Sequence, residues 1–240
     1  MAPKPRLFFL STARSHAAKS RSPVRLQFLF SIEFDRYARR TLPETANAQR
    51  RNPMVSLKLK LTRSQQEKWY LRLLTDHPSG DSYDGIVVHQ ATDFVVLREM
   101  QDFESDGLIV LPRKHLTGHR DGRFERCGNA ILKLNRAHNR LRVPRWLRSC
   151  DSLPAIMAAL QARDIWPAVE VTYDKGNQTA VYLGVIESVD KSGFSIKGYS
   201  ASGTWEKRSR IEMDEVFRLE FDSRYCNHFN AYMKSRPARR

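Results

Sequence analysis

Short apolar runs, broken by polar turns, fill the stretch from residue 83 to residue 123 and return about a hundred positions later. The first set opens at Tyr83 and resumes after a polar turn at Phe94, and the second opens at Tyr182 and resumes at Phe194. Runs of roughly four to eight residues that are rich in valine, isoleucine and aromatic side chains predict strands joined by tight turns. Because the pattern recurs at a nearly constant offset, the sequence predicts two copies of one small bent sheet.

The first copy carries a family pattern. Tyr83 and Gly85 precede an apolar strand, Asp93 stands at the turn, and a second apolar strand follows. This order resembles the first motif of Sm-like proteins, and the segment 109–112 followed by Leu116 resembles their second motif. The resemblance covers roughly forty residues per copy and implies small β-barrel modules.

The loop residues of Sm-like proteins that bind RNA are not matched. Such proteins have an asparagine after the aspartate turn and a basic residue before the last glycine. No asparagine follows Asp93 in the next strand, and Thr117 stands before Gly118. The second copy reads 217–219 at the corresponding place and has no glycine there. The resemblance therefore implies the fold, without the uridine pocket.

The predicted fold class is mainly β with α. We expect two small bent-sheet or barrel (Sm-like) modules, each covered by a helix and joined by a helical connector. The predicted parts are a disordered or spurious N-terminal extension (1–53), a first module with an N-terminal helix (54–126), a basic connector (127–164), a second module with a C-terminal helix (165–233) and a basic tail (234–240).

The start of the first module predicts a strand and then a helix. Apolar and polar residues alternate over 55–62, which is typical of a strand with one solvated face. Ser64 and Glu67 have the spacing of a capping box. A helix beginning there would place Trp69 and Leu73 on one side and end before Asp76.

The remaining helices follow from capping residues. In the connector, a helix is predicted from Ala130 to Leu141, ended by Pro144, and a second helix is capped by Asp151 or Ser152. A strand is predicted over 166–173. Asp222 or Ser223 is expected to cap a last helix, whose side chains should pack over the second module: Tyr225, Phe229, Tyr232 and Met233.

Three explanations remain open for residues 1–53. The segment combines Pro, Arg, Ser and Ala with apolar clusters that keep neither a helical nor a strand period. Translation could begin at Met54, the segment could be a disordered arm, or its arginine-rich and acid-poor composition could address the chain to an organelle.

The net charge of +15 is unevenly distributed. Residues 1–53 contribute +8, the cation run in the connector (133–148) +6 and the tail +4, which leaves −3 for the rest of the chain, so the repeated modules are mildly acidic. A cation run with an aromatic residue inside it is either a solvated helix face or a surface for RNA, on which a base could stack. The candidate nucleic-acid-binding residues are Lys133, Arg136, Arg140, Arg142, Arg145, Trp146 and Arg148.

Other chemistry-bearing residues have unfavourable spacing. His115 and His119 could share a metal only on a helix, and Pro112 and Gly118 argue against one there. Cys226 and His228 would face different directions on a helix, Cys127 has no orienting acid beside it, and the acidic turn at 102–107 lacks the closing glutamate of a calcium loop. We therefore expect no catalytic, cofactor or metal site.

The cysteines and the hydropathy of the chain bear on where the protein is located. Three widely separated cysteines indicate a reducing compartment, and no apolar run is long enough to span a membrane, so a cytoplasmic location is predicted. The predicted function is that of a non-enzymatic interaction module that presents loops to an unidentified protein partner. The alternative is RNA binding through the connector, from Lys133 to Arg148.

Overall fold

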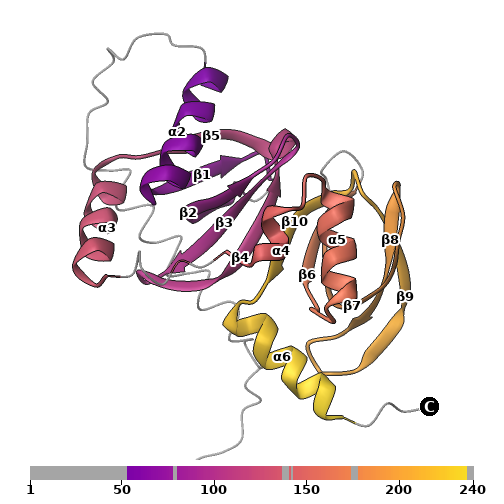
Figure 1. Ribbon diagram of the computed structural model, residues 1–240. Helices are drawn as coiled ribbons and strands as arrows, with labels where there is room; N and C mark the ends of the chain where they lie inside the picture. The colour runs from indigo at the N-terminus through magenta and orange to yellow at the C-terminus, as the bar shows by residue number, and fades with distance from the viewer. Residues whose placement is uncertain (1–52, 78–79, 137–140, 142, 174–177, 237–240) are drawn as a thin grey trace, which may run out of the picture. The chain divides into compact units, whose positions relative to one another are not determined.

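The computed structural model describes residues 53–77, 80–136, 141, 143–173 and 178–236. Its strands come in two groups of five along the chain (Figure 1). The first group is β1 (Tyr70–Thr75), β2 (Ser82–Gln90), β3 (Phe94–Gln101), β4 (Glu104–Pro112) and β5 (Leu116–Arg120). The second is β6 (Ala168–Tyr173), β7 (Gln178–Val189), β8 (Gly193–Tyr199), β9 (Trp205–Glu212) and β10 (Val216–Phe221).

Helices precede and follow each group of strands. Helix α2 (Pro53–Glu67) precedes the first group and α3 (Arg123–Leu134) follows it. Helices α4 (Arg145–Arg148) and α5 (Leu153–Ala162) precede the second group, and α6 (Arg224–Ser235) follows it. A short 3-10 helix, η1 (Arg113–His115), joins β4 to β5. The predicted class, mainly β with α, is confirmed.

All ten strands belong to one antiparallel sheet, in the order β5-β1-β2-β3-β4-β10-β6-β7-β8-β9. Within each group the order is the same, since the fifth strand lies beside the first and the others follow in sequence. The groups meet where β10 pairs with β4, through residues such as Leu219 opposite Val110 and Phe221 opposite Leu108. The sheet is therefore continuous and open at β5 and β9, and the two sets of strands are not separate sheets.

The repeated glycines have the same environment in both groups. A Cβ atom on Gly85 would lie 2.5 Å from the carbonyl oxygen of Arg98, and one on Gly184 would lie 2.2 Å from that of Lys197. Each glycine lets its strand approach the next strand more closely than any side chain would allow. The sequence repeat around the tyrosines and glycines therefore marks a close approach between the second and third strands of each group.

The two groups also share a helix contact that the apolar pattern of the sequence does not reveal. The amide of Asn129 on α3 donates to the carbonyl oxygen of Tyr70 at 3.0 Å, and the amide of Asn230 on α6 donates to that of Trp166 at 2.8 Å. In each group, the helix that follows the last strand thus holds the entrance to the first strand.

The two main cores lie on opposite faces of β3 and β4. On one face, Leu97 of β3 packs with Leu61 of α2. On the other face, Phe94 of β3 packs with Ile156 of α5. All four side chains are fully buried, and burial of a Leu, Ile or Phe side chain stabilises the fold by about 1.5–3 kcal/mol. Strands buried on both faces have continuous apolar runs, as observed here.

The predictions for residues 55–74 were wrong in type. Residues 53–67 form helix α2 and residues 70–75 form strand β1. The alternation of leucines was misleading because positions four apart fit both periods: Leu57 and Leu61 are buried, whereas Leu59 between them is 63% exposed. Residues 69–74 looked helical because apolar side chains lie on both faces of β1, with Leu71 in one core and Tyr70 in another. Apolar residues therefore occur at helical spacings as well as at the alternate positions of a strand.

In the connector, one helix was misplaced and one was correct. The helix expected from Ala130 to Leu141 is α3, which begins at Arg123 and ends at Leu134. Pro144 does not end it but stands at the N-cap of α4. Helix α5 has the expected N-cap, Ser152, and the strand predicted over 166–173 is β6, which begins at Ala168.

Helix α6 has its expected cap and part of its expected core. The hydroxyl of Ser223 accepts a hydrogen bond from the backbone N–H of Cys226 at 3.2 Å. Met233 is buried as predicted, whereas Tyr225 and Tyr232 are about half exposed (46% and 50%). The prediction that all four residues pack over the second group was therefore wrong for these tyrosines, and Cys226 takes part in the core instead.

A charged cluster lies where the two groups of strands meet. Arg218 of β10 donates to Glu170 of β6, with 3.0 Å between Nε and Oε2, and its guanidinium lies 5.4 Å from the ring centroid of Tyr83. The Nε2 atom of His77 lies 3.0 Å from the other oxygen of Glu170. The cluster therefore connects β6 and β10 of the second group to β2 and to the residues after β1 in the first group.

Glu99 of β3 lies near the same cluster. Burial, together with repulsion from Glu220 of β10, raises the pKa of Glu99 to about 7. Arg218 acts in the opposite direction and lowers it in part. At neutral pH this carboxyl group therefore stays partly protonated, whereas an exposed glutamate is fully ionised.

Candidate anion-binding site

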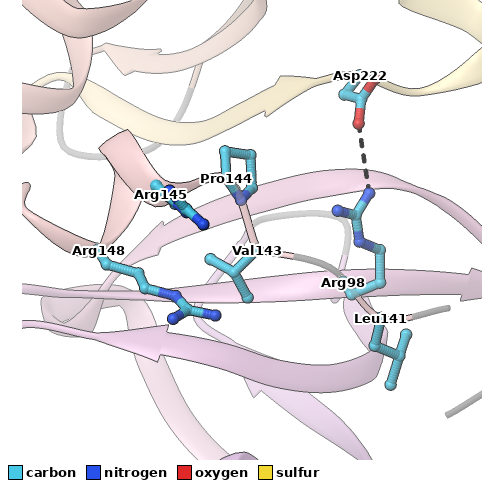
Figure 2. Close-up of a pocket in the computed structure, with 7 residues that line it drawn as sticks. All are labelled: Arg98, Leu141, Val143, Pro144, Arg145, Arg148 and Asp222. Atoms are coloured by element: carbon cyan, nitrogen blue, oxygen red, sulfur yellow. Dashed lines mark hydrogen bonds and ion pairs between the residues drawn. The ribbon is translucent and has the colours of Figure 1, made fainter. Parts of the chain in front are cut away.

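Three arginines surround a pocket of about 660 Å³ between β3, the connector and the turn that joins β10 to α6. Figure 2 shows Arg145 and Arg148 on one side of this pocket and Arg98 on the other. We call it the arginine pocket, and its lining residues are Arg98, Leu141, Val143, Pro144, Arg145, Arg148 and Asp222.

Arg98 is the rigid member of the site. It stands on β3, between strands paired on both sides, and is only 8% exposed. Its Nη1 atom lies 3.5 Å from Oδ2 of Asp222 (Figure 2). Burial lowers the pKa of the Arg98 guanidinium, yet an arginine side chain keeps its charge in a protein. A fixed positive charge therefore forms one wall.

Arg145 and Arg148 are the adaptable members. They begin and end α4, stand three residues apart and are both exposed. Residues at this spacing lie on one side of a helix. Between them, Leu147 is fully buried in the core formed with α5, which holds the short helix against the protein. The two guanidinium groups can therefore turn toward a ligand while their backbone stays fixed.

The lining charges favour an anion. Three guanidinium groups and one carboxylate, that of Asp222, line the arginine pocket. A guanidinium presents a planar fork of N–H donors that matches the oxygens of phosphate and carboxylate groups. Asp222 has a φ of 62°, in the left-handed region that Asn and Asp tolerate, and its carboxylate lies beside the Arg98 guanidinium.

The structure separates the predicted basic residues. Arg145 and Arg148 line the arginine pocket, whereas Lys133 lies on α3, with its ammonium 6.0 Å from the ring centroid of Trp69. Arg136 has a φ of 51° just beyond the C-cap of α3. Arg140 and Arg142 lie outside the described residues.

Trp146 faces a different direction from the arginines beside it in the sequence. The Arg163 guanidinium lies 5.1 Å from its ring centroid, and the ring of Phe221 lies 5.8 Å away. It is half-buried and lines a neighbouring pocket. The aromatic residue of the predicted patch is therefore adjacent to the cations and not among them.

Sequence reasoning missed Arg98 and Asp222. Arg98 follows four apolar residues of β3, in a stretch interpreted as core, and Asp222 was considered only as a helix cap. Their proximity depends on the pairing of β10 with β4, which brings together residues 124 positions apart. The one signal in the sequence was a charged residue that directly follows an apolar run.

The other candidates lie apart from this pocket. His115 of η1 contacts Asp76 and the ring of Phe217, and His119 stands on β5. Burial lowers the pKa of both histidines. In the described part of the chain, no group of three or more His, Cys, Asp or Glu side chains is arranged to hold a metal ion.

The thiols differ in accessibility. Burial raises the pKa of the Cys226 thiol to about 11, and the nearby Glu220 carboxylate acts in the same direction, so this thiol stays protonated at neutral pH. Cys150 is also buried, and Cys127 is exposed. A thiolate nucleophile at Cys226 is disfavoured by these surroundings.

Among the described residues, no helix has the length and apolar character needed to cross a membrane. Comparison with models of protein families, with curated proteins and with solved structures finds no match.

Proposed function

We propose that this protein is a non-enzymatic RNA-binding protein that holds the phosphates of a single strand in the arginine pocket. One observation carries the proposal: Arg98, from the first group of strands, converges with Arg145 and Arg148 of the connector on one pocket of about 660 Å³. Pockets that bind ligands commonly have volumes of roughly 300–1,000 Å³.

The arrangement suits phosphate because it combines one fixed and two mobile guanidinium groups. Arg98 is held by its buried position, so little side-chain entropy is lost when it binds. Arg145 and Arg148 are exposed and can adjust to successive phosphates along a backbone. A positively charged groove with neighbouring aromatic side chains is the usual design of proteins that bind single strands.

The proposed architecture is two Sm-like units in tandem. Its support is the strand order shared by the two groups, the matched glycines Gly85 and Gly184, and the matched helix contacts of Asn129 and Asn230. The residues of the uridine pocket are not matched, so the proposed RNA site differs from that of the family. A protein partner was the first expectation from the sequence, and the arginine pocket now favours RNA over it.

The test is fluorescence anisotropy with a labelled oligouridylate of roughly ten nucleotides, at about 50 and about 200 mM salt. The variant Arg145→Gln/Arg148→Gln should weaken binding and reduce the slope of log K against log salt by about 1.4, which corresponds to two lost phosphate contacts. The matched control, Lys191→Gln/Lys207→Gln, removes the same charge from the β7 to β8 turn and from β9, where both lysines are exposed.

The control should keep the wild-type slope. Absence of binding at the lower salt concentration would overturn the proposal, as would an equal loss in both double variants. An acidic peptide, poly-glutamate, is added as a competitor. If it binds more tightly than the oligouridylate, the site recognises protein carboxylates and the RNA proposal is wrong.

A further inference from the structure

A second pocket, of about 460 Å³, adjoins the arginine pocket. The two share Pro144 and Asp222 as lining residues. Its other walls come from the connector, from the residues just before β6 and from one side of α6. We call it the tryptophan pocket, and the side chains used below are Trp146, Trp166, Phe221, Asn227, Asn230 and Lys234.

We infer that the tryptophan pocket is a base-binding subsite, which receives the nucleobase attached to a phosphate held in the arginine pocket. The inference rests on the proposed RNA binding and adds to it the part of the ligand that is recognised beside the backbone. A nucleotide joins an anionic group to a flat heteroaromatic ring, and the two adjoining pockets offer cations and aromatic rings in the same relation.

The aromatic walls are rigid. Trp166 packs edge-on against Trp205, with 5.8 Å between ring centroids, and its indole N–H donates to Asp164 at 2.5 Å. Trp146 is held by Phe221 on the side of the core. Two indole rings fixed before the ligand arrives lose little entropy on binding, so their contact area contributes to affinity.

The polar groups of α6 complete the pocket. Asn230 is already engaged, since its amide donates to the carbonyl oxygen of Trp166 and its oxygen accepts from the Tyr199 hydroxyl at 2.6 Å. Asn227, three residues earlier on the same side of the helix, is exposed and lines the pocket. Its amide carries both donors and an acceptor, which suits the hydrogen-bonding edge of a base.

A lysine stands beside this pocket. The ammonium of Lys234 lies 4.6 Å from the ring centroid of Trp166 and 2.7 Å from the Asp164 carboxylate. Both of these charged side chains reach solvent (43% and 66% exposed), so the pair can open at small cost. A base that stacks on Trp166 takes the place of the ammonium, which then faces the next phosphate of the strand.

A phosphotyrosine also joins a phosphate to an aromatic ring, but its phenyl ring has no hydrogen-bonding edge. Asn227 therefore favours a nucleobase. The experiment compares an oligouridylate of roughly ten nucleotides with an abasic ribose-phosphate oligomer of the same length, by anisotropy at about 50 mM salt. The wild-type protein should bind the oligouridylate at least about 10-fold more tightly, because stacking of one base is sufficient for that factor.

Two variants test the pocket. Trp146→Leu removes one of the two indole walls, so it should reduce the preference for the oligouridylate and leave the affinity for the abasic oligomer unchanged. Asn227→Ala should weaken the binding of the oligouridylate alone, by about 2- to 10-fold. His228→Ala, at the next exposed position of α6, is the matched control and should change neither affinity. Circular dichroism shows whether Trp146→Leu folds, and Asn227→Ala tests the pocket independently if it does not.

The possible failures are distinguishable. Equal affinities of the wild-type protein for the two oligomers would overturn the base subsite and leave the proposed RNA binding intact. Parallel losses for both oligomers in Asn227→Ala would also overturn the subsite. If neither oligomer binds, the proposed function fails, and the base subsite fails with it.

Discussion

Neutralising Glu99 should stabilise the protein at neutral and alkaline pH. The Glu99 carboxyl group lies on β3, near Arg218 and Glu220, and burial is the main cause that raises its pKa from 4.5 to about 7. A raised pKa means that the folded protein binds a proton more tightly than the unfolded chain does. The stabilisation from this proton is fully present below pH 4.5 and is lost as the pH rises through about 7.

The magnitude follows from the size of the shift. One pKa unit corresponds to about 1.4 kcal/mol, so the full shift corresponds to an upper bound of about 3 kcal/mol. Because Glu99 is partly exposed, we expect a smaller value, on the order of 1–3 kcal/mol, for the gain of Glu99→Gln over the wild-type protein at pH 8. Glutamine resembles the protonated carboxyl group in shape and removes the ionisation.

The assay is urea unfolding followed by circular dichroism, at intervals from pH 4.5 to pH 8.5 for both proteins. The difference in free energy of unfolding should grow with pH, with most of the change between pH 5 and 8. Glu104→Gln is the control, because this exposed residue at the start of β4 should give a profile parallel to that of the wild-type protein. A constant difference for Glu99→Gln across the range would refute the reasoning.

Three further substitutions test other parts of the structure. Gly184→Ala should lower the free energy of unfolding in urea by on the order of 1–3 kcal/mol, because its Cβ would lie 2.2 Å from a backbone oxygen. Gly118→Ala is the control and should be tolerated, because the nearest atom to its Cβ would lie at 3.6 Å. Equal effects of the two substitutions would contradict the close approach at Gly184. Asn129→Ala removes both hydrogen bonds to the backbone of Tyr70 and should cost on the order of 2–3 kcal/mol in thermal or urea unfolding; a loss under about 0.5 kcal/mol would contradict its structural role. Asp222→Asn keeps the left-handed turn and removes a carboxylate from the arginine pocket, so it should tighten oligouridylate binding a few-fold by anisotropy, and weaker binding would count against an anion site.

Much of the strand pattern could be predicted because local residues determine it. The turns before Phe94 and Phe194 lie between apolar runs whose lengths fit strands, and the structure places β3 and β8 there. Ser152 and Ser223 both occupy the N-cap positions expected from the sequence, since a helix start depends on the few residues around it, and the Ser223 side chain also accepts a capping hydrogen bond.

The predictions that failed concern features that depend on tertiary contacts. Residues 53–67 are a helix because Leu57, Leu61 and Ser64 are buried together against the sheet, and no local rule distinguishes this stripe from a strand. Likewise, the run of cations in the sequence indicated Arg145 and Arg148 as binding residues, but it did not indicate the other residues of their pocket. Arg98 reaches the same pocket only through the pairing of strands that are far apart in the sequence.

The pairing of β10 with β4 also has a thermodynamic consequence. Main-chain hydrogen bonds cross from one half of the protein to the other, so neither half can unfold without exposing strand edges of its neighbour. The arginine pocket takes Arg98 from the first half and Asp222 from beyond the last strand of the second. A ligand bound in this pocket would therefore raise the free energy of unfolding of both halves together.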